Sequence, residues 1–310
     1  MQGMQRTREM QEMQEARPAV EPVDAVVLAG GRLSGLFAWA AGTRVKALAP
    51  VCGVSVVARV LRALQETPGV VRIVVVGPEA VRDALATLPP APPPTIDTPQ
   101  SPIDNRRSPI ASPLWVPAGS SALENLCRGL DAVEAGGNGT RRVLVCGADT
   151  PLLTPLALAD FLRRCPADAD LCMPVVRKET FVRRFPGNLG IYVRLVEGAF
   201  SSGSQLLLRP RAVRENLPLL RSLHAARKSQ LAMARLLGMD VVGKLVRGRL
   251  GVPELEARAS ALTRCRCRAV LDCAPELSYD IDVVLDLWDA RRRCGEVGAC
   301  LEHTESRGAG

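Results

Sequence analysis

The sequence predicts a three-layer α/β/α fold on a mostly parallel sheet. Apolar runs of strand length at 25–29 and 71–76 alternate with helical patterns at 55–66 and 80–88, which is the βαβα rhythm of a parallel sheet covered on both faces. Crossovers between parallel strands are right-handed, so the loops that follow successive strands are expected at one edge of the sheet. Ligands of open α/β sheets bind at that edge.

Composition is that of an ordinary globular protein. The 310 residues are 47% apolar and 23% charged, which suits one large α/β domain or two small ones. The formal net charge is +8, but the arginines are scattered and only 3% of residues are aromatic, so few side chains are available to stack on bases. We therefore expect phosphorylated small molecules rather than nucleic acid as partners. The sequence gives no signal for an oligomeric state.

The cysteines and the N-terminal segment indicate the cellular compartment in which the protein is expected. Ten cysteines occur without regular pairing or a secretion signal, so reduced thiols and a cytoplasmic protein are expected. Cys265, Cys267 and Cys273 lie close together in sequence, but the two-cysteine pairs of a zinc site are missing. Residues 1–22 are polar and are expected to form a disordered tail. No run reaches the ~20 apolar residues of a membrane span.

The end of the first apolar run is a candidate phosphate-binding loop. It consists of Leu28, Ala29, Gly30, Gly31 and Arg32. Glycine has no Cβ to hold a ligand away, and the N-terminus of the next helix carries partial positive charge. The Gly-Lys-Ser/Thr ending of a Walker A loop and the spacing of a dinucleotide fingerprint are both absent. A turn with a purely structural purpose is the alternative.

Two charged residues are expected beside this loop. The flexible ammonium of Lys46 is suited to neutralising a polyphosphate. Asp149 follows the apolar run Val143-Leu-Val-Cys146, a strand that delivers its carboxylate to the same edge of the sheet. The alternative for Asp149 is a helix cap, for which Thr150 or Thr154 is better suited.

These motifs together resemble those of the MobA-like NTP transferases, a nucleotidyltransferase family with a GT-A-like fold. The resemblance extends from about residue 24 to 291 and rests on five segments: Val27-Leu-Ala-Gly-Gly31, Lys46-Ala-Leu-Ala-Pro-Val-Cys-Gly53, Gly119-Ser-Ser-Ala-Leu-Glu-Asn125, Val145-Cys-Gly-Ala-Asp-Thr-Pro151 and Ser278-Tyr-Asp-Ile-Asp282.

The resemblance implies an activity and a site. An NMP moiety would pass from an NTP to a phosphorylated or hydroxyl small-molecule acceptor, with release of pyrophosphate. Asp149 and Asp282 would hold Mg²⁺, and together with Lys46 they form the expected catalytic set. For Asp286, an acid at a helix N-terminus is the better explanation.

Gly119, Ser120 and Asn125 are implied by the same resemblance to face the nucleotide. Ser120 or Ser121 followed by Glu124 is also a capping box, and both roles are compatible because a capped helix N-terminus attracts anions.

Two departures from the family pattern keep a second function open. Ser202-Gly-Ser-Gln205 stands where the family leads us to expect Thr-Gly-Gly-Asn, and the connection from Gly31 to Lys46 is unusually long. The alternative is a catalytically silent nucleotide-binding regulatory protein of the same fold.

The predicted domain covers residues 23–291. It contains a Pro-rich loop at 89–117, expected to be disordered, and a helical insertion at about 209–262. A second tail is expected at 292–310.

Overall fold

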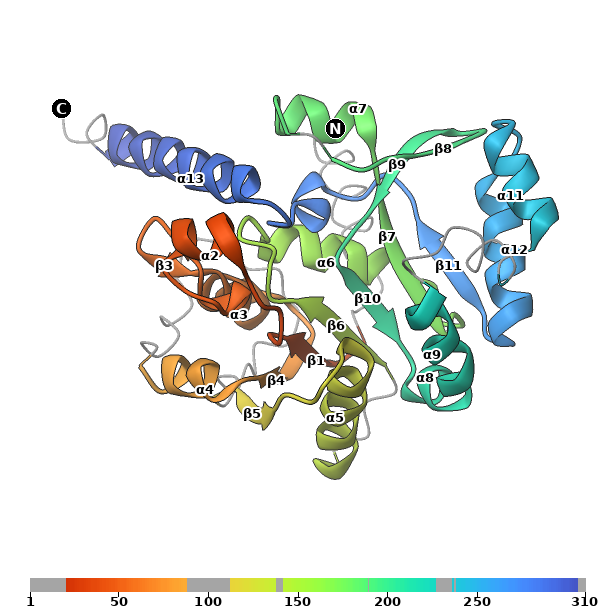
Figure 1. Ribbon diagram of the computed structural model, residues 1–310, viewed down its shortest axis with the longest axis horizontal. Coiled ribbons are helices and arrows are strands. Elements are labelled where there is room, and N and C mark those ends of the chain that lie inside the picture. Colours follow the sequence, from red (N-terminus) through yellow and green to blue (C-terminus); the bar gives the residue numbers. More distant parts are fainter. Residues whose placement is uncertain are drawn as a thin grey trace, which may run out of the picture.

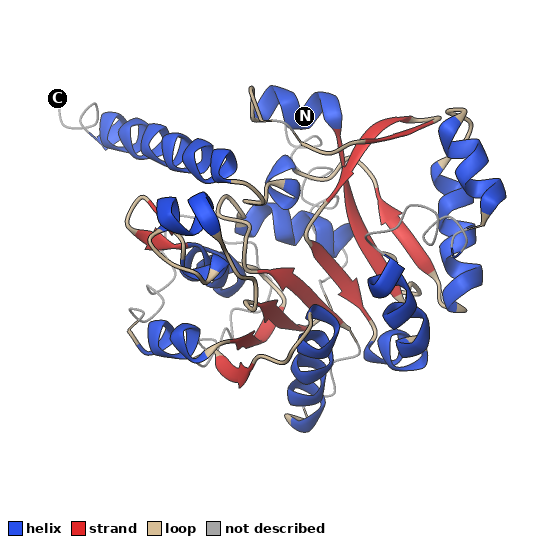
Figure 2. Ribbon diagram, in the orientation of Figure 1, coloured by secondary structure: helices blue, strands red, loops and turns tan. Residues whose placement is uncertain are grey.

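The structure is a computed structural model, in which nine strands of the described chain form one sheet between two layers of helices (Figure 1; Figure 2). It describes residues 21–87, 112–137, 142–188, 190–226, 236 and 238–305, with only the backbone of residues 224 and 295–305. Parts of four expectations therefore lie outside the described residues: the tail at 1–20, most of the Pro-rich loop at 88–111, the helical insertion at 227–235 and 237, and the second tail at 306–310.

The sheet is mostly parallel. In sheet order its strands are β5 (Leu114–Pro117), β4 (Val70–Gly77), β1 (Val23–Leu28), β6 (Val143–Gly147), β10 (Gln205–Leu208), β7 (Leu171–Arg177), β9 (Gly198–Ser202) and β8 (Val193–Leu195), with β11 (Cys267–Val270) beside β7. The first four run parallel, whereas β10 lies antiparallel between β6 and β7. A separate hairpin joins β2 (Pro50–Val51) to β3 (Val54–Ser55).

The helices follow the strands along the chain. They are α2 (Gly35–Ala41), α3 (Val56–Glu66), α4 (Glu79–Ala86), α5 (Ala122–Ala135), α6 (Pro155–Arg164), α7 (Lys178–Arg184), α8 (Pro210–Glu215), α9 (Leu217–Ala226), α11 (Met239–Val246), α12 (Val252–Thr263) and α13 (Val284–Glu305), with short 3₁₀ helices η1 (Lys46–Leu48) and η2 (Pro275–Ser278).

Alternate side chains of the central strands enter two different cores. Ala25 and Val27 pack into the larger core with residues of α3 and α6, and Val26 packs into the second core with residues of α5 and α8. Burial on both faces explains why β1 reads as an apolar run without alternation. The predicted three-layer α/β/α fold is confirmed.

The prediction of a loop through residue 117 was wrong at its end. Leu114–Pro117 is strand β5, which pairs in parallel with β4 at the edge of the sheet. Proline flanks and ends this strand, a position that edge strands tolerate because one side of the strand makes no ladder hydrogen bonds. The Trp115 indole donates to the Gly77 carbonyl oxygen at 3.1 Å and strengthens the attachment.

Several helices differ from expectation. The predicted helical insertion at about 209–262 begins with two separate helices, α8 and α9, which are divided at Asn216 because Pro218 in the first turn of α9 has no N–H to continue a ladder. The short helices α2 and α7 were not predicted. The expected tail from residue 292 continues α13 without a break to Glu305.

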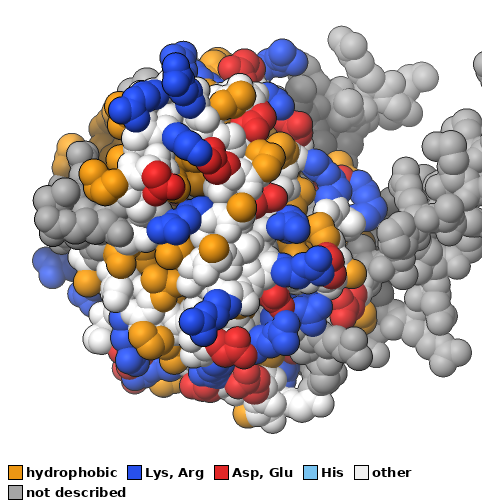
Figure 3. Space-filling view, turned by 90° about the vertical axis from the view of Figure 1, so that its right-hand side faces the viewer, with side chains coloured by type: hydrophobic (Ala, Val, Ile, Leu, Met, Phe, Trp, Pro, Cys, Tyr) orange, Lys and Arg blue, Asp and Glu red, His pale blue; other side chains and the backbone are white. Residues whose placement is uncertain are grey.

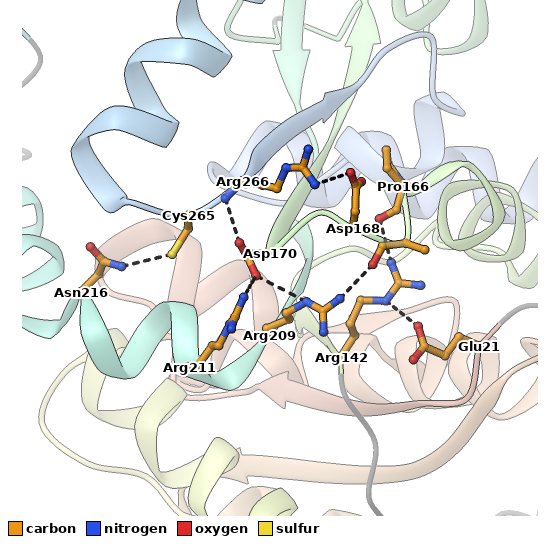
Figure 4. Close-up of polar contacts among 11 residues, drawn as sticks. Glu21, Arg142, Pro166, Asp168, Asp170, Arg209, Arg211, Asn216, Cys265 and Arg266 are labelled. Carbon is orange, nitrogen blue, oxygen red and sulfur yellow. Dashed lines mark hydrogen bonds and ion pairs between the residues drawn. The ribbon is translucent and has the colours of Figure 1, made fainter.

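Asp170 joins the helical segment to the sheet at the edge where β7 begins (Figure 4). Its carboxylate accepts hydrogen bonds from Arg211 Nη2 at 2.7 Å and from the Arg266 backbone N–H at 2.9 Å, and it also pairs with Arg209. Burial would raise the pKa of Asp170, but these donors hold it below its usual value. This cluster is structural and lies at the sheet edge opposite the ends of β1 and β6.

The face carried by α11, α12 and β8 has no single charge (Figure 3). Basic side chains there are interspersed with acidic and apolar ones, among them the Lys244–Glu254 ion pair between α11 and α12. No helix in the described part of the chain has the length and apolar content of a membrane span.

Candidate active site

The glycine loop leaves the sheet between two neighbouring strands. The Leu28 carbonyl oxygen accepts a hydrogen bond from the Ala148 N–H at 3.2 Å, and the Ala29 N–H donates to Val76 at 2.8 Å. β1 is thus fixed to both β6 and β4 up to its last residue. Gly30 and Gly31 follow at the edge where parallel strands end, as the sequence predicts.

The connection from Gly31 to Lys46 is a closed lobe. Lys46 N–H donates to the Gly31 carbonyl oxygen at 2.9 Å, and Leu33 N–H donates to Arg44 at 2.8 Å, with α2 between the two arms. A Cβ on Gly31 would lie 3.3 Å from the Lys46 Cβ. Close packing therefore holds the lysine stem directly against the glycine loop.

Lys46 brings the two predicted carboxylates together. Its Nζ lies 2.8 Å from Asp149 Oδ2 and 2.7 Å from Asp282 Oδ1. Burial lowers the pKa of Lys46, but the two carboxylates together raise it above its usual value. The Asp282 side chain is 65% exposed and that of Asp149 is 26% exposed, so both can be reached from solvent.

Neighbouring residues position each carboxylate. A Cβ at Gly147 would lie 2.4 Å from Asp149 Oδ1, so only glycine leaves room for this side chain. Ile281 N–H donates to the Asp149 carbonyl oxygen at 3.1 Å, which links the two acidic segments. Asp286 Oδ2 accepts hydrogen bonds from the N–H groups of Asp282 and Val283 at 2.9 Å, so Asp286 caps the start of α13 as expected.

Asp280 is a third carboxylate, which was not predicted as a site residue. It is half-buried, and the hydroxyl of Ser204 donates to its Oδ2 at 3.3 Å. Burial, followed by Asp282 and Asp149, raises the pKa of Asp280 to about 6. The alternation of Asp280 and Asp282 was the available signal, since it places both side chains on one side of an extended segment.

Asn125 joins the glycine loop to the second loop. Its Oδ1 accepts a hydrogen bond from the Gly119 N–H at 2.6 Å, and its Nδ2 lies 2.5 Å from where a Cβ on Gly30 would be. Asn125 is buried. These three predicted residues therefore lie together at the start of α5.

Ser120 is engaged by Glu124. Its N–H and hydroxyl both donate to Glu124 Oε2 at 2.7 Å, and Ser121 caps α5 by accepting from the Glu124 N–H at 3.1 Å. Hydrogen bonds from Ser120 and then Arg128 lower the pKa of Glu124 to about 2. The capping role expected here is confirmed. Unlike Asn125, Ser120 has no contact with Gly30 among the contacts of the described chain.

A hollow opens beside these residues. It has a volume of about 440 Å³ and is lined by Arg32, Leu33, Ser34, Phe37, Lys46, Asp282, Val283 and Val284. Its walls come from the lobe after the glycine loop and from the start of α13. Cationic, anionic and apolar side chains meet there.

The donor set suits a hard cation. No group of three or more His, Cys, Asp or Glu side chains in the described segments forms a ready-made metal centre. Two carboxylates that already share one cation, Lys46, match the way proteins hold Mg²⁺, with one or two carboxylates plus substrate phosphates and water. The residues present therefore fit the ion that the sequence analysis expected.

The altered turn at Ser202–Gln205 extends from the surface at Ser202 into the core at Gln205. Gln205 is fully buried opposite Cys146 of β6, and its Oε1 lies 3.2 Å from where a Cβ on Gly203 would be. Gln205 thus does not line the hollow, although the adjacent Ser204 contacts Asp280.

Comparison with known proteins identifies the family of the chain. The model of the MobA-like NTP transferase domain matches residues 25–239. The chain belongs to this nucleotidyltransferase family. A hypothetical transferase from Thermus thermophilus is 37% identical, with a TM-score of 0.69, over 86% of this chain and 99% of that one.

Two other solved structures have lower sequence identity and lower TM-scores. A nucleotidyl transferase from Methanothermobacter is 19% identical with a TM-score of 0.49, over 88% of this chain and 97% of that one. A 4-diphosphocytidyl-2C-methyl-D-erythritol synthase from Anaerococcus prevotii is 10% identical with a TM-score of 0.48, over 89% and 96%. No curated protein matches the chain.

Proposed function

We propose that this NTP transferase domain transfers an NMP moiety from an NTP to a phosphorylated or hydroxyl small-molecule acceptor, releasing pyrophosphate in an Mg²⁺-dependent reaction. The observation that carries the proposal is the contact of Lys46 Nζ with both Asp149 and Asp282 beside the glycine loop. A cation and two carboxylates at the ends of the strands lie where a bound triphosphate would need charge compensation.

Each group has a distinct task. The glycine loop offers backbone N–H groups to the phosphates, and Lys46 offsets their charge. Asp149 and Asp282 would hold Mg²⁺, which supplies stabilisation of the charge on the transferring phosphoryl group. The acceptor oxygen attacks the α-phosphorus, and the bond to the β-phosphate oxygen breaks as pyrophosphate leaves. No protein nucleophile is required, because positioning and charge compensation lower the barrier.

Two departures from the family pattern kept the silent regulatory alternative open. The long connection from Gly31 to Lys46 is a closed lobe that holds the lysine in place. Gln205, which stands where the family pattern leads us to expect Asn, is buried and does not line the hollow. Neither departure removes a charged group from the site.

The test is a screen for pyrophosphate release. Purified protein is incubated with each of the four NTPs and a panel of sugar phosphates and polyols, with Mg²⁺ or with EDTA. The proposal expects acceptor-dependent release in Mg²⁺ only. Binding of an NTP with Mg²⁺, but no release with any acceptor, would support the regulatory alternative instead.

A further inference from the structure

Two cysteines from distant parts of the sequence lie next to each other beside the candidate active site. Cys52 is in the turn between β2 and β3, and Cys294 is in the third turn of α13. The Arg59 side chain connects them, because its Nη2 donates both to the carbonyl oxygen of Val51, the neighbour of Cys52, and to Cys294 Sγ. The Cys52 thiol also donates to the Arg291 carbonyl oxygen at 3.2 Å, one helical turn before Cys294. Figure 1 shows α13 passing along this edge, close to α2 and β3.

Two arginines hold the turn and the helix together, mainly through backbone carbonyl oxygens. Arg291 donates to the carbonyl oxygens of Pro50 at 2.9 Å and Ala40 at 3.2 Å. Arg59 Nη2 lies 2.8 Å from both the Val51 carbonyl oxygen and Cys294 Sγ. These arginine contacts therefore keep the two cysteines close to each other.

The turn itself gives no conformational reason for cysteine. Cys52 has φ 49° and precedes Gly53 at φ 77°. Positive φ favours Gly, Asn or Asp, and a cysteine there is uncommon. The backbone conformation therefore does not explain why a cysteine stands at this position.

Solvent reaches this pair more readily than most other cysteines. Cys52 is exposed and Cys294 is half-buried, whereas six other described cysteines are buried: Cys146, Cys165, Cys172, Cys265, Cys267 and Cys273. Burial and the Cys294 thiol raise the pKa of Cys52, while the positive charges of Arg59 and Arg291 act in the opposite direction. Because Cys52 is more exposed than Cys294, a reagent in solution reaches the Cys52 thiol first.

We propose that Cys52 and Cys294 form a reversible intrachain disulfide by exchange with a small-molecule disulfide such as oxidised glutathione. The Cys52 thiolate attacks one sulfur of the reagent, which forms a mixed disulfide and releases one small thiolate. The Cys294 thiolate then attacks the Cys52 sulfur, which forms the intrachain bond and releases the second. The two cysteine protons end on the released thiols, and two electrons pass from the protein to the reagent.

The bond would join the two walls of the hollow. Cys52 follows the segment that carries Lys46, and Cys294 lies on the helix that begins just after Asp282. Oxidation would therefore prevent these two segments from separating. A cross-link between residues so distant in sequence restricts the unfolded chain strongly, so the oxidised protein should melt at a higher temperature.

The test treats the full-length native protein with oxidised glutathione and maps its peptides without reduction. We expect a Cys52–Cys294 cross-linked peptide that dithiothreitol reverses, with a higher Tm. Cys127→Ser, a matched control at a half-buried cysteine, should behave like wild type. Cys294→Ser and Cys294→Ala should instead retain one glutathione on Cys52. Wild type that keeps glutathione on Cys52 without cross-linking, or that leaves Cys52 unmodified while buried cysteines react, would overturn the proposal.

Discussion

Lys46 is the residue on which the candidate site converges. Its ammonium lies between Asp149 and Asp282, at 2.8 and 2.7 Å. A divalent cation would use the same carboxylate oxygens. If Mg²⁺ binds as proposed, the lysine and the metal would therefore compete for these oxygens until phosphates provide the lysine with another partner.

Replacing Lys46 with Met should separate these two effects. The apolar stem remains, but the competing positive charge is gone, so Mn²⁺ without nucleotide should bind more tightly than to wild type. NTP should bind with a loss of about 1.5–3 kcal/mol, the size of a charge-assisted hydrogen bond. Calorimetry with Mn²⁺ alone and with NTP measures both quantities. Lys244→Met, in the surface pair with Glu254, is the control. Weaker Mn²⁺ binding to Lys46→Met would contradict the competition.

Asp280 should make stability depend on pH. Its folded pKa of about 6 lies above the unfolded value of about 3.9. The native state therefore binds more protons between pH ~4 and ~6, and its stability falls as the pH rises through this window. The full effect is on the order of 2–3 kcal/mol. Asp280→Asn should remove this component and be more stable than wild type at pH 7.

Urea unfolding in EDTA measures this pH-dependent component of stability. The free energies of unfolding of wild type and Asp280→Asn are compared at pH 4.5 and at pH 7.5, and their difference should change between the two pH values. Equal differences at the two pH values would show that Asp280 keeps an ordinary pKa.

At the same scale, sequence motifs located the strand-end residues but not their surroundings. Asp149 was recognisable as an acid that follows an apolar run, and Asp282 through the resemblance of Ser278-Tyr-Asp-Ile-Asp282 to a family motif. The perturbed state of Asp280 depends on Asp149, which is 131 positions away, and on burial by the assembled fold. Such an effect has no local signature in sequence.

At the scale of elements, the glycine loop and the N-terminus of α5 form one unit. Asn125 binds the Gly119 N–H and leaves no room for a side chain at Gly30. Its amide cannot move aside easily, because movement would break the bond to Gly119 and strand a buried polar group.

A double-mutant cycle tests this unit. Gly30→Ala should destabilise the protein and weaken NTP binding, because the new Cβ would lie 2.5 Å from Asn125 Nδ2. Asn125→Ala alone should cost about 1–3 kcal/mol, since Gly119 loses its partner. In the double variant the clash is absent, so the coupling should be roughly 0.5–3 kcal/mol. Urea unfolding of the four proteins gives the coupling, and strict additivity would refute the close packing.

Elements with strong periodicity were predictable, and elements fixed by tertiary contacts were not. The strands β1, β4 and β6 and the helices α3 and α5 follow from their apolar patterns. β5 is only four residues long and lies among prolines, so its pairing with β4 decides its conformation. α2 has no charged residue in its terminal turns and no side-chain cap. It lies between the two hydrogen-bonded arms of the lobe, which fix its position.

At the scale of the whole molecule, the parallel sheet brings distant segments to one edge. Gly31, Asp149 and Asp282 meet there because β1 and β6 run in the same direction and the chain returns to them before α13. The arginine cluster around Asp170 occupies the opposite edge and holds the helical segment in place. The order of motifs was sufficient to predict this arrangement. The identities of the NTP and the acceptor were not predictable in the same way, because they would depend on the shape of the hollow, which no motif describes.

The most direct test of the proposed activity is Mg²⁺-dependent pyrophosphate release by wild type, Asp149→Asn and Asp282→Asn, with the Tm of each protein. Asparagine keeps the shape of aspartate but removes its charge, so both variants should fold while turnover falls by orders of magnitude. Asp240→Asn, on α11, is the control and should retain wild-type activity. Release that persists in EDTA, or variants as active as wild type, would contradict a reaction in which these two carboxylates hold the metal.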